Sequence, residues 1–491
     1  MVKKQKKNNK KKRAGKGFKR NRAKARKINA STGFDTCTEQ LSPFGGLLGL
    51  IKFLDLVNFS EIFDSAYIAP RRDPKLGHYL MVVGILMLLF IGFNRICHFA
   101  YVQLDAMICG FFKVTRLPVV STFWRYVDSL GINQGKSLLT VMSVLRERVW
   151  KQLGLHYGQI NISIDTTVET LFGHQQGGRK GHNTKNRGKK GYRPVLAFID
   201  QTREYIAGKL RVGETISGQE TADFIRAIKN QLPGCVQDVL LRADGEFCSW
   251  AAVAAAKVCG FRFIIANKGC TPLFDPHTWY RPYQRSDIEY NDCFYQPMGW
   301  QEPCRFVVMR IPKEQKADKP IQQTLLEEDR YTYRIFCTDK AGPAHKVIAE
   351  YDKRADVENL VGEAKREGLE AIPTGKFKSN YAFFQLVMLA YNIWRYMKLL
   401  AVQIETVSES TEASGPGMKG IDTNTLRIAR LKILLIAAKV VMDQNRTKVK
   451  YSIHDARTPA MINFLNFLDE ARNKPKAWLS GGGWPQNFAI T

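Results

Sequence analysis

Residues 351–365 read YDKRADVENLVGEAK, and their spacing predicts a helix. The stretch contains no proline, Gly342-Pro343 precedes it and Gly368 follows it, which are start and stop signals for a helix. At about 100° per residue, a stripe roughly 60° wide collects four polar residues: Tyr351, Arg354, Glu358 and Lys365. Only Glu358 adds a carboxylate to this ridge, so it is a candidate functional residue. The alternative is an amphipathic helix with ordinary surface ion pairs.

The chain has a large excess of positive charge. Its 491 residues include 74 Lys and Arg against 45 Asp and Glu, a formal net charge of +29. Fifteen of the cations lie in residues 1–27, which contain no acid. This composition predicts a disordered basic arm over residues 1–30 and indicates a polyanionic partner, nucleic acid before membrane. The arm is either a DNA-binding segment or a solubilising tail.

The cysteine pattern disfavours a zinc-binding or secreted protein, and the length of the apolar runs disfavours a membrane-spanning protein. The ten cysteines stand singly, without a CxxC pair and without histidines at ligand spacing. We therefore expect a reduced intracellular protein and no zinc site. The longest apolar run, residues 79–93, is shorter than the roughly 20 residues that a bilayer requires. A buried helix is expected there, with no membrane partner and a cytoplasmic, nucleoid-associated location.

The hydrophobic period changes along the chain from helical to alternating. A helical pattern over residues 31–157 predicts a DNA-binding or a purely structural domain, with Arg125 on a short helix as a candidate DNA contact. The next segment alternates as a strand that ends at Asp165. Three strands followed by alternating helices and strands predict an α/β fold, a ribonuclease H-like mixed sheet. Its fourth strand, residues 238–243, delivers Asp244.

The remaining boundaries follow shifts in composition. We expect a core in two parts, a mainly β insertion between them, a linker and a helical C-terminal region. The ranges are 158–266 and 343–400 for the core, 267–342 for the insertion, 401–420 for the linker and 421–491 for the C-terminal region. A long helix is predicted for residues 426–442. Trp279 and Trp300, in the insertion, either stack on an unpaired base or fill the insertion's own core.

A glycine-rich, basic loop is predicted between the first two strands. Residues 173–193 read GHQQGGRKGHNTKNRGKKGYR. The loop is either a DNA-contacting hairpin or a solvated basic segment, and its position near the end of the first strand favours DNA. Its candidate DNA contacts are Arg179, Lys180, Lys185, Arg187, Lys189, Lys190 and Arg193.

Two strand-terminal aspartates and the helical glutamate are candidate catalytic and metal-binding residues. Ligands of α/β sheets collect beyond strand ends, so Asp165 and Asp244 can converge there, and a helix packed on the sheet can add Glu358. Three carboxylates at such a point can hold two Mg²⁺ or Mn²⁺ ions, which catalyse phosphodiester displacement. Glu246 and Asp200 are weaker rivals, because each also lies near a strand end.

Together these residues resemble a known family. Asp165 in SIDTT, Asp244 in LRADGEF and the Y-x2-R-x3-E-x6-K spacing of residues 351–365 are similar to the DDE transposases of bacterial insertion sequences that bear the Tyr-Arg-Glu-Lys signature. The resemblance implies a ribonuclease H-like core that binds Mg²⁺ through the two aspartates and Glu358. It implies cut-and-paste transposition by strand cleavage and strand transfer. The other signature residues would contact DNA phosphates: Tyr351, Arg354 and Lys365.

The predicted function is therefore that of a transposase, which binds the terminal inverted repeats of a mobile DNA element. Its partner would be double-stranded DNA, at the element ends and at the target, and a homodimer is expected on the DNA. Two alternatives remain. One is a non-catalytic basic DNA- or RNA-binding protein that keeps only the fold, and the other is a sequence-independent nuclease of the same fold.

Overall fold

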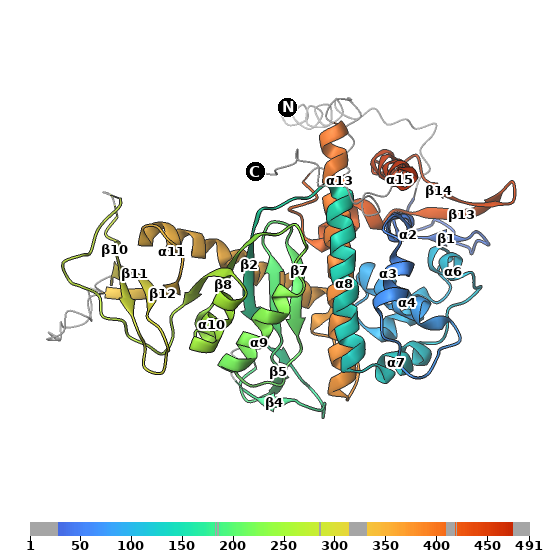
Figure 1. The fold of residues 1–491 in the computed structure, drawn as a ribbon. Coiled ribbons are helices and arrows are strands. Elements are labelled where there is room, and N and C mark those ends of the chain that lie inside the picture. The colour runs from blue at the N-terminus through green and yellow to red at the C-terminus, as the bar shows by residue number, and fades with distance from the viewer. Residues whose placement is uncertain are drawn as a thin grey trace, which may run out of the picture. The chain divides into compact units, whose positions relative to one another are not determined.

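Figure 1 shows the fold in a computed structural model of the chain. The structure describes residues 28–181, 183, 186–283, 286–313, 331–408, 418 and 420–474. The chain divides into two compact units, residues 1–40 and 41–491. All of the elements below belong to the second unit. The basic arm predicted for residues 1–30 lies outside the described residues, except for its last three.

An eight-stranded mixed sheet lies at the centre of residues 41–491, in the order β10-β11-β12-β9-β8-β2-β6-β7. The strands are β2 (Gln159–Thr166), β6 (Val195–Ile199), β7 (Glu204–Lys209), β8 (Asp238–Ala243), β9 (Phe261–Ala266), β10 (Glu289–Tyr295), β11 (Cys304–Pro312) and β12 (Tyr331–Thr338). Strands β2, β6 and β7 form an antiparallel meander, and β8 and β9 run parallel to β2. The predicted α/β, ribonuclease H-like sheet is confirmed.

The register between β2 and β8 brings two candidate residues to one edge of the sheet. Ile160, Ile162 and Ile164 are fully buried, which explains why this alternating segment forms a strand. Ile164 pairs with Ala243 in the parallel β2–β8 ladder. The next residue in each segment is an aspartate, so Asp165 and Asp244 follow at the same edge.

The predicted insertion adds strands to this same sheet. Strands β10, β11 and β12 pair antiparallel in sequence. β12 also pairs antiparallel with β9, with Phe336 opposite Ala266, and so connects these three strands to the rest of the sheet. Residues 314–330, between β11 and β12, lie outside the described residues. The described part of the predicted insertion therefore contains three strands, which extend the central sheet.

Helices cover both faces of the sheet (Figure 1). Those packed on the sheet include α9 (Gly218–Lys229), α10 (Trp250–Val258) and α13 (Phe377–Ser408). The N-terminal helices include α2 (Leu47–Leu56), α3 (Phe59–Ala66), α4 (Gly77–Phe90), α6 (Ala106–Phe112), α7 (Val120–Ser129) and α8 (Ile132–Leu153). The apolar run predicted as a buried helix forms α4, which is buried from Met81 to Phe90. Within the described ranges, no helix is long and apolar enough to cross a membrane.

A buried polar network attaches the two longest helices to the sheet. Helices α8 and α13 run side by side (Figure 1). The fully buried carboxylate of Glu204, in β7, accepts hydrogen bonds from four side chains at 2.5–2.9 Å. The four donors are Arg146, Trp150, Thr202 and Tyr396. Glu204 thus connects α8 and α13 to an edge strand of the sheet.

The prediction of a long helix over residues 426–442 is wrong. The structure has a short helix α14 (Leu426–Ala429), a π-helical turn η6 (Arg430–Leu434) and then a hairpin of β13 (Ala438–Asp443) and β14 (Arg446–Tyr451). The β-branched pair Val440-Val441 and the alternating RTKVKY segment favour strands over a helix. Strand β1 (Leu41–Ser42) pairs with β13, and helix α15 (Thr458–Asn473) follows the hairpin.

The predicted boundaries of the linker and of the basic loop also change. Helix α13 continues to Ser408, through the first part of the predicted linker at 401–420, and residues 409–417 and 419 lie outside the described residues. Two segments of the predicted basic loop at 173–193 form a small sheet with a short strand that precedes the loop. Its strands are β3 (Glu169–Thr170), β4 (Arg179–Lys180) and β5 (Lys190–Tyr192), in the order β3-β5-β4. This short antiparallel pairing was not visible in the glycine-rich sequence.

Candidate active site

The segment 351–365 lies in a nearly continuous helical stretch, as predicted. Helix α11 (Ala344–Asp352) leads through one 3-10 turn, η4 (Lys353–Ala355), into α12 (Asp356–Ala364) and a π-helical turn η5 (Lys365–Leu369). Gly368 ends the stretch with φ 123°, a conformation that only glycine adopts without strain. The 3-10 turn between the two α-helices points Arg354 into the protein, where its side chain is buried.

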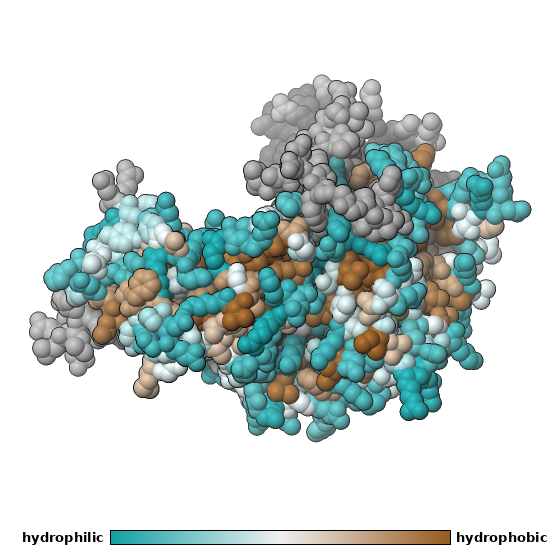
Figure 2. All heavy atoms as spheres, in the orientation of Figure 1, coloured by the Kyte–Doolittle hydropathy of each residue, from teal (hydrophilic) through white to brown (hydrophobic). Residues whose placement is uncertain are grey.

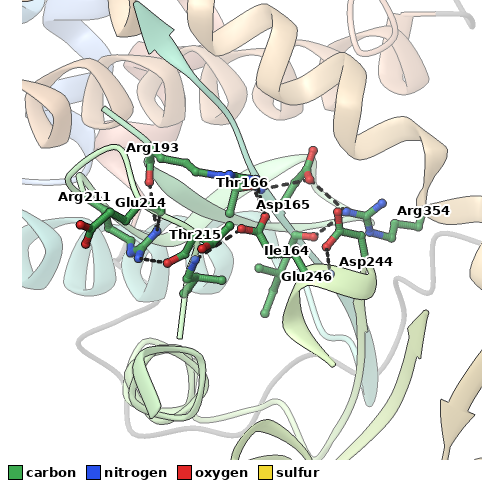
Figure 3. Close-up of polar contacts among 11 residues, drawn as sticks. Ile164, Asp165, Thr166, Arg193, Arg211, Glu214, Thr215, Asp244, Glu246 and Arg354 are labelled. Atoms are coloured by element: carbon green, nitrogen blue, oxygen red, sulfur yellow. Dashed lines mark hydrogen bonds and ion pairs between the residues drawn. The ribbon is translucent and has the colours of Figure 1, made fainter. Parts of the chain in front are cut away.

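Arg354 joins this helical stretch to the end of β2. Its guanidinium donates to the carbonyl oxygen of Ile164 at 2.8 Å and to Oδ1 of Asp165 at 3.1 Å. On the neighbouring strand, Asp244 accepts a hydrogen bond from the backbone N–H of Glu246 at 3.0 Å. Figure 3 shows Asp165, Asp244 and Arg354 gathered at the ends of β2 and β8. The two aspartates thus lie at the predicted strand ends, and the residue of the helical stretch that contacts Asp165 is Arg354, whereas the sequence predicts Glu358 in that role.

The charges of the other two candidate carboxylates act on Asp165. Burial is the main cause that raises the pKa of Asp165 to about 6, and the negative charges of Asp244 and Glu358 raise it further. The positive charge of Arg354 and the backbone N–H of Thr166 lower the pKa in part. Glu358, on α12, is itself exposed. A mostly buried aspartate surrounded by two further acids is therefore the electrostatic centre of the site.

The donor set fits a hard divalent cation in its chemistry. Among the residues that the structure describes, no three His, Cys, Asp or Glu side chains lie close enough to hold a metal ion as they are placed. Yet carboxylate oxygens are the ligands that Mg²⁺ and Mn²⁺ prefer. A cation would also relieve the repulsion that raises the pKa of Asp165. In this structure Arg354 supplies part of that positive charge.

In the metal-free protein, we expect Asp165→Asn to increase the free energy of unfolding at neutral pH. The folded-state pKa of about 6 lies above the usual 3.8, so ionisation of Asp165 destabilises the fold. This cost is absent below about pH 4, grows as the pH rises, and reaches about 3 kcal/mol at most above about pH 6. Thermal unfolding measured across this pH range, with and without Mg²⁺, checks it. Mg²⁺ should raise the Tm of the wild type only, and identical pH profiles for the two proteins would contradict the assignment.

The two rival carboxylates are held by other partners. Glu246 accepts hydrogen bonds from Thr166 Oγ1 at 2.9 Å and from Arg193 at 2.8 Å. Asp200 forms an ion pair with the buried Arg242 and accepts a hydrogen bond from a serine of β2. Both are therefore satisfied by structural contacts, whereas the contact of Asp244 is a backbone cap that leaves its other oxygen available for a ligand.

A cavity of about 960 Å³ opens beside Asp165 and Glu358. One wall is formed by α12 and η5, and another by the segment from the end of β2 to Phe172. A third wall comes from the N-terminal helical region, through residues 94–97 and Trp124. The Trp124 indole donates to the carbonyl oxygen of Pro373 at 2.9 Å, which fixes it at the rim. No sequence pattern indicated that residues 94–97, Trp124 or the exposed Phe172 would line this cavity.

Lys365 and Tyr351, the other two residues of the signature, lie near the site and contact other protein groups. Lys365 lines the cavity, donates to the carbonyl oxygen of Val168 at 2.8 Å and lies 3.5 Å from the Glu370 carboxylate. The ring of Tyr351 packs on Phe336, with the ring centres 4.5 Å apart. Burial raises the pKa of the Tyr351 hydroxyl, and the nearby charges of the two aspartates add to this effect.

The basic residues predicted to contact DNA are mostly exposed. Arg193 lines the cavity, and Arg179 forms an ion pair with Glu214. Exposed cations of the small sheet and its loop are Lys180, Arg187, Lys189 and Lys190, and Arg125 is exposed on α7. Lys185 lies outside the described residues.

The two tryptophans considered for base stacking pack against side chains of the protein. The guanidinium of Arg310 lies over the ring of Trp279, 4.0 Å from its centre. Trp300 packs near Trp250 and Phe306, with ring centres about 6 Å apart. Neither lines the cavity beside Asp165, whereas Phe172 does and is 83% exposed.

Comparisons with known proteins point to one family. The family model described as "Transposase DDE domain group 1" matches residues 25–473. Comparison with curated protein sequences gives no match. A solved structure of the piggyBac transposase synaptic complex with hairpin DNA is similar at 12% identity and a TM-score of 0.37, over 87% of this chain and 84% of that chain. That likeness is too weak to bear on fold or function. Because the family model spans most of its length, the chain belongs to the family of transposase DDE domains, group 1.

Proposed function

We propose that this protein is a metal-dependent transposase that moves a bacterial insertion sequence of the Tyr-Arg-Glu-Lys type by cut and paste. It would bind the terminal inverted repeats of the element as a homodimer and act on nucleoid DNA. One observation carries the proposal. Asp165, Asp244 and Glu358 are remote along the chain, yet the charges of the other two both act on Asp165, at the rim of a wide cavity.

In this proposal Asp165, Asp244 and Glu358 hold two Mg²⁺ or Mn²⁺ ions. When bound, such ions lower the barrier to phosphodiester displacement by stabilising charge on the reacting oxygens. Arg354 acts as a positioning residue, because it fixes the Asp165 carboxylate against the end of β2. Lys365 offers a point charge to a DNA phosphate at the cavity wall.

The helical region at 31–157 is proposed to bind DNA beside the catalytic core. Support comes from the cavity, whose wall includes residues 94–97 and Trp124 of that region. DNA that enters the cavity would therefore touch both parts of the chain. The exposed cations of the small sheet, with Arg125 of α7, would contact the phosphate backbone around it.

The proposed function is tested by DNA cleavage. The substrate is a duplex that carries the terminal inverted repeats flanking the gene, and the control is a duplex of equal length with scrambled ends. With Mg²⁺ or Mn²⁺ we expect cuts at the repeat ends only, and with EDTA no cuts. Equal cutting of both duplexes would favour a sequence-independent nuclease. Binding without cutting in any divalent ion would favour a non-catalytic nucleic-acid-binding protein.

A further inference from the structure

The hairpin of β13 and β14 is a two-stranded ribbon over most of its length. Strand β1 pairs only with the first two residues of β13, and β14 is the edge strand of this sheet. Gln444 and Asn445 form the turn with φ 48° and 59°, which suits the twist of a tight hairpin. Figure 1 shows the hairpin extending past β1, and in Figure 2 its outer end is coloured as hydrophilic.

The register of the hairpin separates its side chains onto two faces. One face holds Ala438, Val440, Met442, Thr447, Val449 and Tyr451. On that face Val440, Val449 and Tyr451 pack on the main core, and the Tyr451 hydroxyl donates to the carbonyl oxygen of Gly45 at 2.9 Å. The opposite face holds Lys439, Val441, Asp443, Arg446, Lys448 and Lys450. It faces away from the anchored side, because neighbouring residues of a strand point to opposite faces.

This second face, which we term the cationic face, has four cations and a single carboxylate. Asp443 forms an ion pair with Lys448 at 2.7 Å. Lys439 and Lys450 lie directly opposite each other in the register. Arg446, Lys448 and Lys450 are exposed. The cationic face therefore exposes three cations beside one carboxylate, an excess of positive charge that a polyanion would neutralise.

We propose that the cationic face of the β13–β14 hairpin binds the phosphate backbone of double-stranded DNA, at a surface apart from the cavity beside Asp165. The inference rests on the proposed function for the nature of the polyanion. A two-stranded ribbon has the right width to enter or follow the major groove of a duplex. None of the hairpin residues lines the cavity. The hairpin is thus a second DNA contact, which holds the duplex through charge and not through base recognition.

The test removes three exposed cations of the cationic face by Arg446→Gln, Lys448→Gln and Lys450→Gln together. The matched control removes three exposed lysines elsewhere, by Lys136→Gln, Lys209→Gln and Lys346→Gln, and so has the same net charge. Affinity for a DNA duplex is measured from about 50 to about 200 mM salt. If all three cations contact phosphates, the slope of log K against log salt falls by about 2.7. Over this fourfold range, wild-type binding then weakens about 40-fold more than that of the hairpin variant.

The control variant should keep a slope near that of the wild type, and both variants should unfold at the wild-type temperature. Equal slopes for the hairpin variant and the wild type would overturn the inference. So would self-association of the hairpin variant with unchanged DNA affinity, because the lysines would then serve only to protect an edge strand. A slope change seen with an RNA duplex but not with DNA would also overturn it.

The outcome can be separated from that of the proposed function. If the wild type cuts at the repeat ends and the hairpin variant keeps the wild-type slope, the function stands and this inference fails. If the wild type cuts no DNA and the hairpin variant shows the expected decrease in the slope of log K against log salt, the inference stands and the function fails. The binding assay is run without divalent ions, so it does not depend on the carboxylates of the cavity.

Discussion

Glu358→Gln is expected to abolish DNA cleavage while leaving DNA binding intact. The amide has nearly the shape of the carboxylate, and Glu358 is exposed on α12, so the fold should persist. The substitution removes one of the three charged ligands proposed for the divalent ions. We expect the rate of cleavage to fall at least about 1,000-fold, which corresponds to about 4 kcal/mol in the barrier. Single-turnover cleavage of the repeat-bearing duplex in Mg²⁺ measures this rate.

Asp352→Asn is the matched control for this prediction. Asp352 lies one 3-10 turn before α12, is exposed, and forms an ion pair with Arg334 at 2.6 Å. The chemical change is of the same kind, but Asp352 does not belong to the proposed ligand set, so cleavage should stay near the wild-type rate. Asp165→Asn and Asp244→Asn should behave like Glu358→Gln. Near-wild-type cleavage by the Glu358 variant, or an equal loss in the Asp352 variant, would contradict the assignment.

Glu204→Ala is expected to lower the free energy of unfolding by about 3–5 kcal/mol. The substitution leaves the guanidinium of Arg146 without its carboxylate in a site where both side chains are 0% exposed. A buried charge that loses its partner carries a large desolvation cost. Trp150 and Tyr396 lose their hydrogen-bond acceptor as well. Urea unfolding followed by circular dichroism measures the change.

Two further variants show whether the buried pair is the cause. Glu147→Ala removes a half-buried carboxylate of α8, which pairs with Lys151 at 3.3 Å, and should change the stability by about 0.5 kcal/mol or less. The double variant Arg146→Met with Glu204→Leu removes both charges together and should recover most of the lost stability. A loss below about 1 kcal/mol for Glu204→Ala would show that α8 and α13 are held to β7 by apolar packing instead.

The parts of the site that local patterns control could be predicted from the sequence. The alternation that ends at Asp165 and the strand before Asp244 are both seen, and the parallel register places the two residues at one edge. The helical spacing of residues 351–365 likewise predicts the stretch that carries Arg354 and Glu358. These predictions succeed because strand and helix periods depend on neighbouring residues.

The parts that depend on distant contacts could not be predicted. Residues 94–97 and Trp124 form a cavity wall only because the N-terminal helices pack against the core. The hydrophobic pattern of a single segment does not predict such packing between distant segments. The predicted long helix includes residues 438–443, yet they form β13, because β14 pairs with all six of these residues and β1 pairs with the first two. The position of Arg354 is a third case. The sequence predicts a phosphate contact, whereas its guanidinium lies on Asp165.

The account rests on three acidic side chains that share divalent ions, and anomalous diffraction from crystals of the DNA complex grown with Mn²⁺ tests this most directly. We expect manganese with oxygen ligands from Asp165, Asp244 and Glu358, at about 2.0–2.2 Å from the metal. Arg354 should remain against the end of β2. Manganese bound elsewhere in the complex, with none of these three carboxylates among its ligands, would contradict the account.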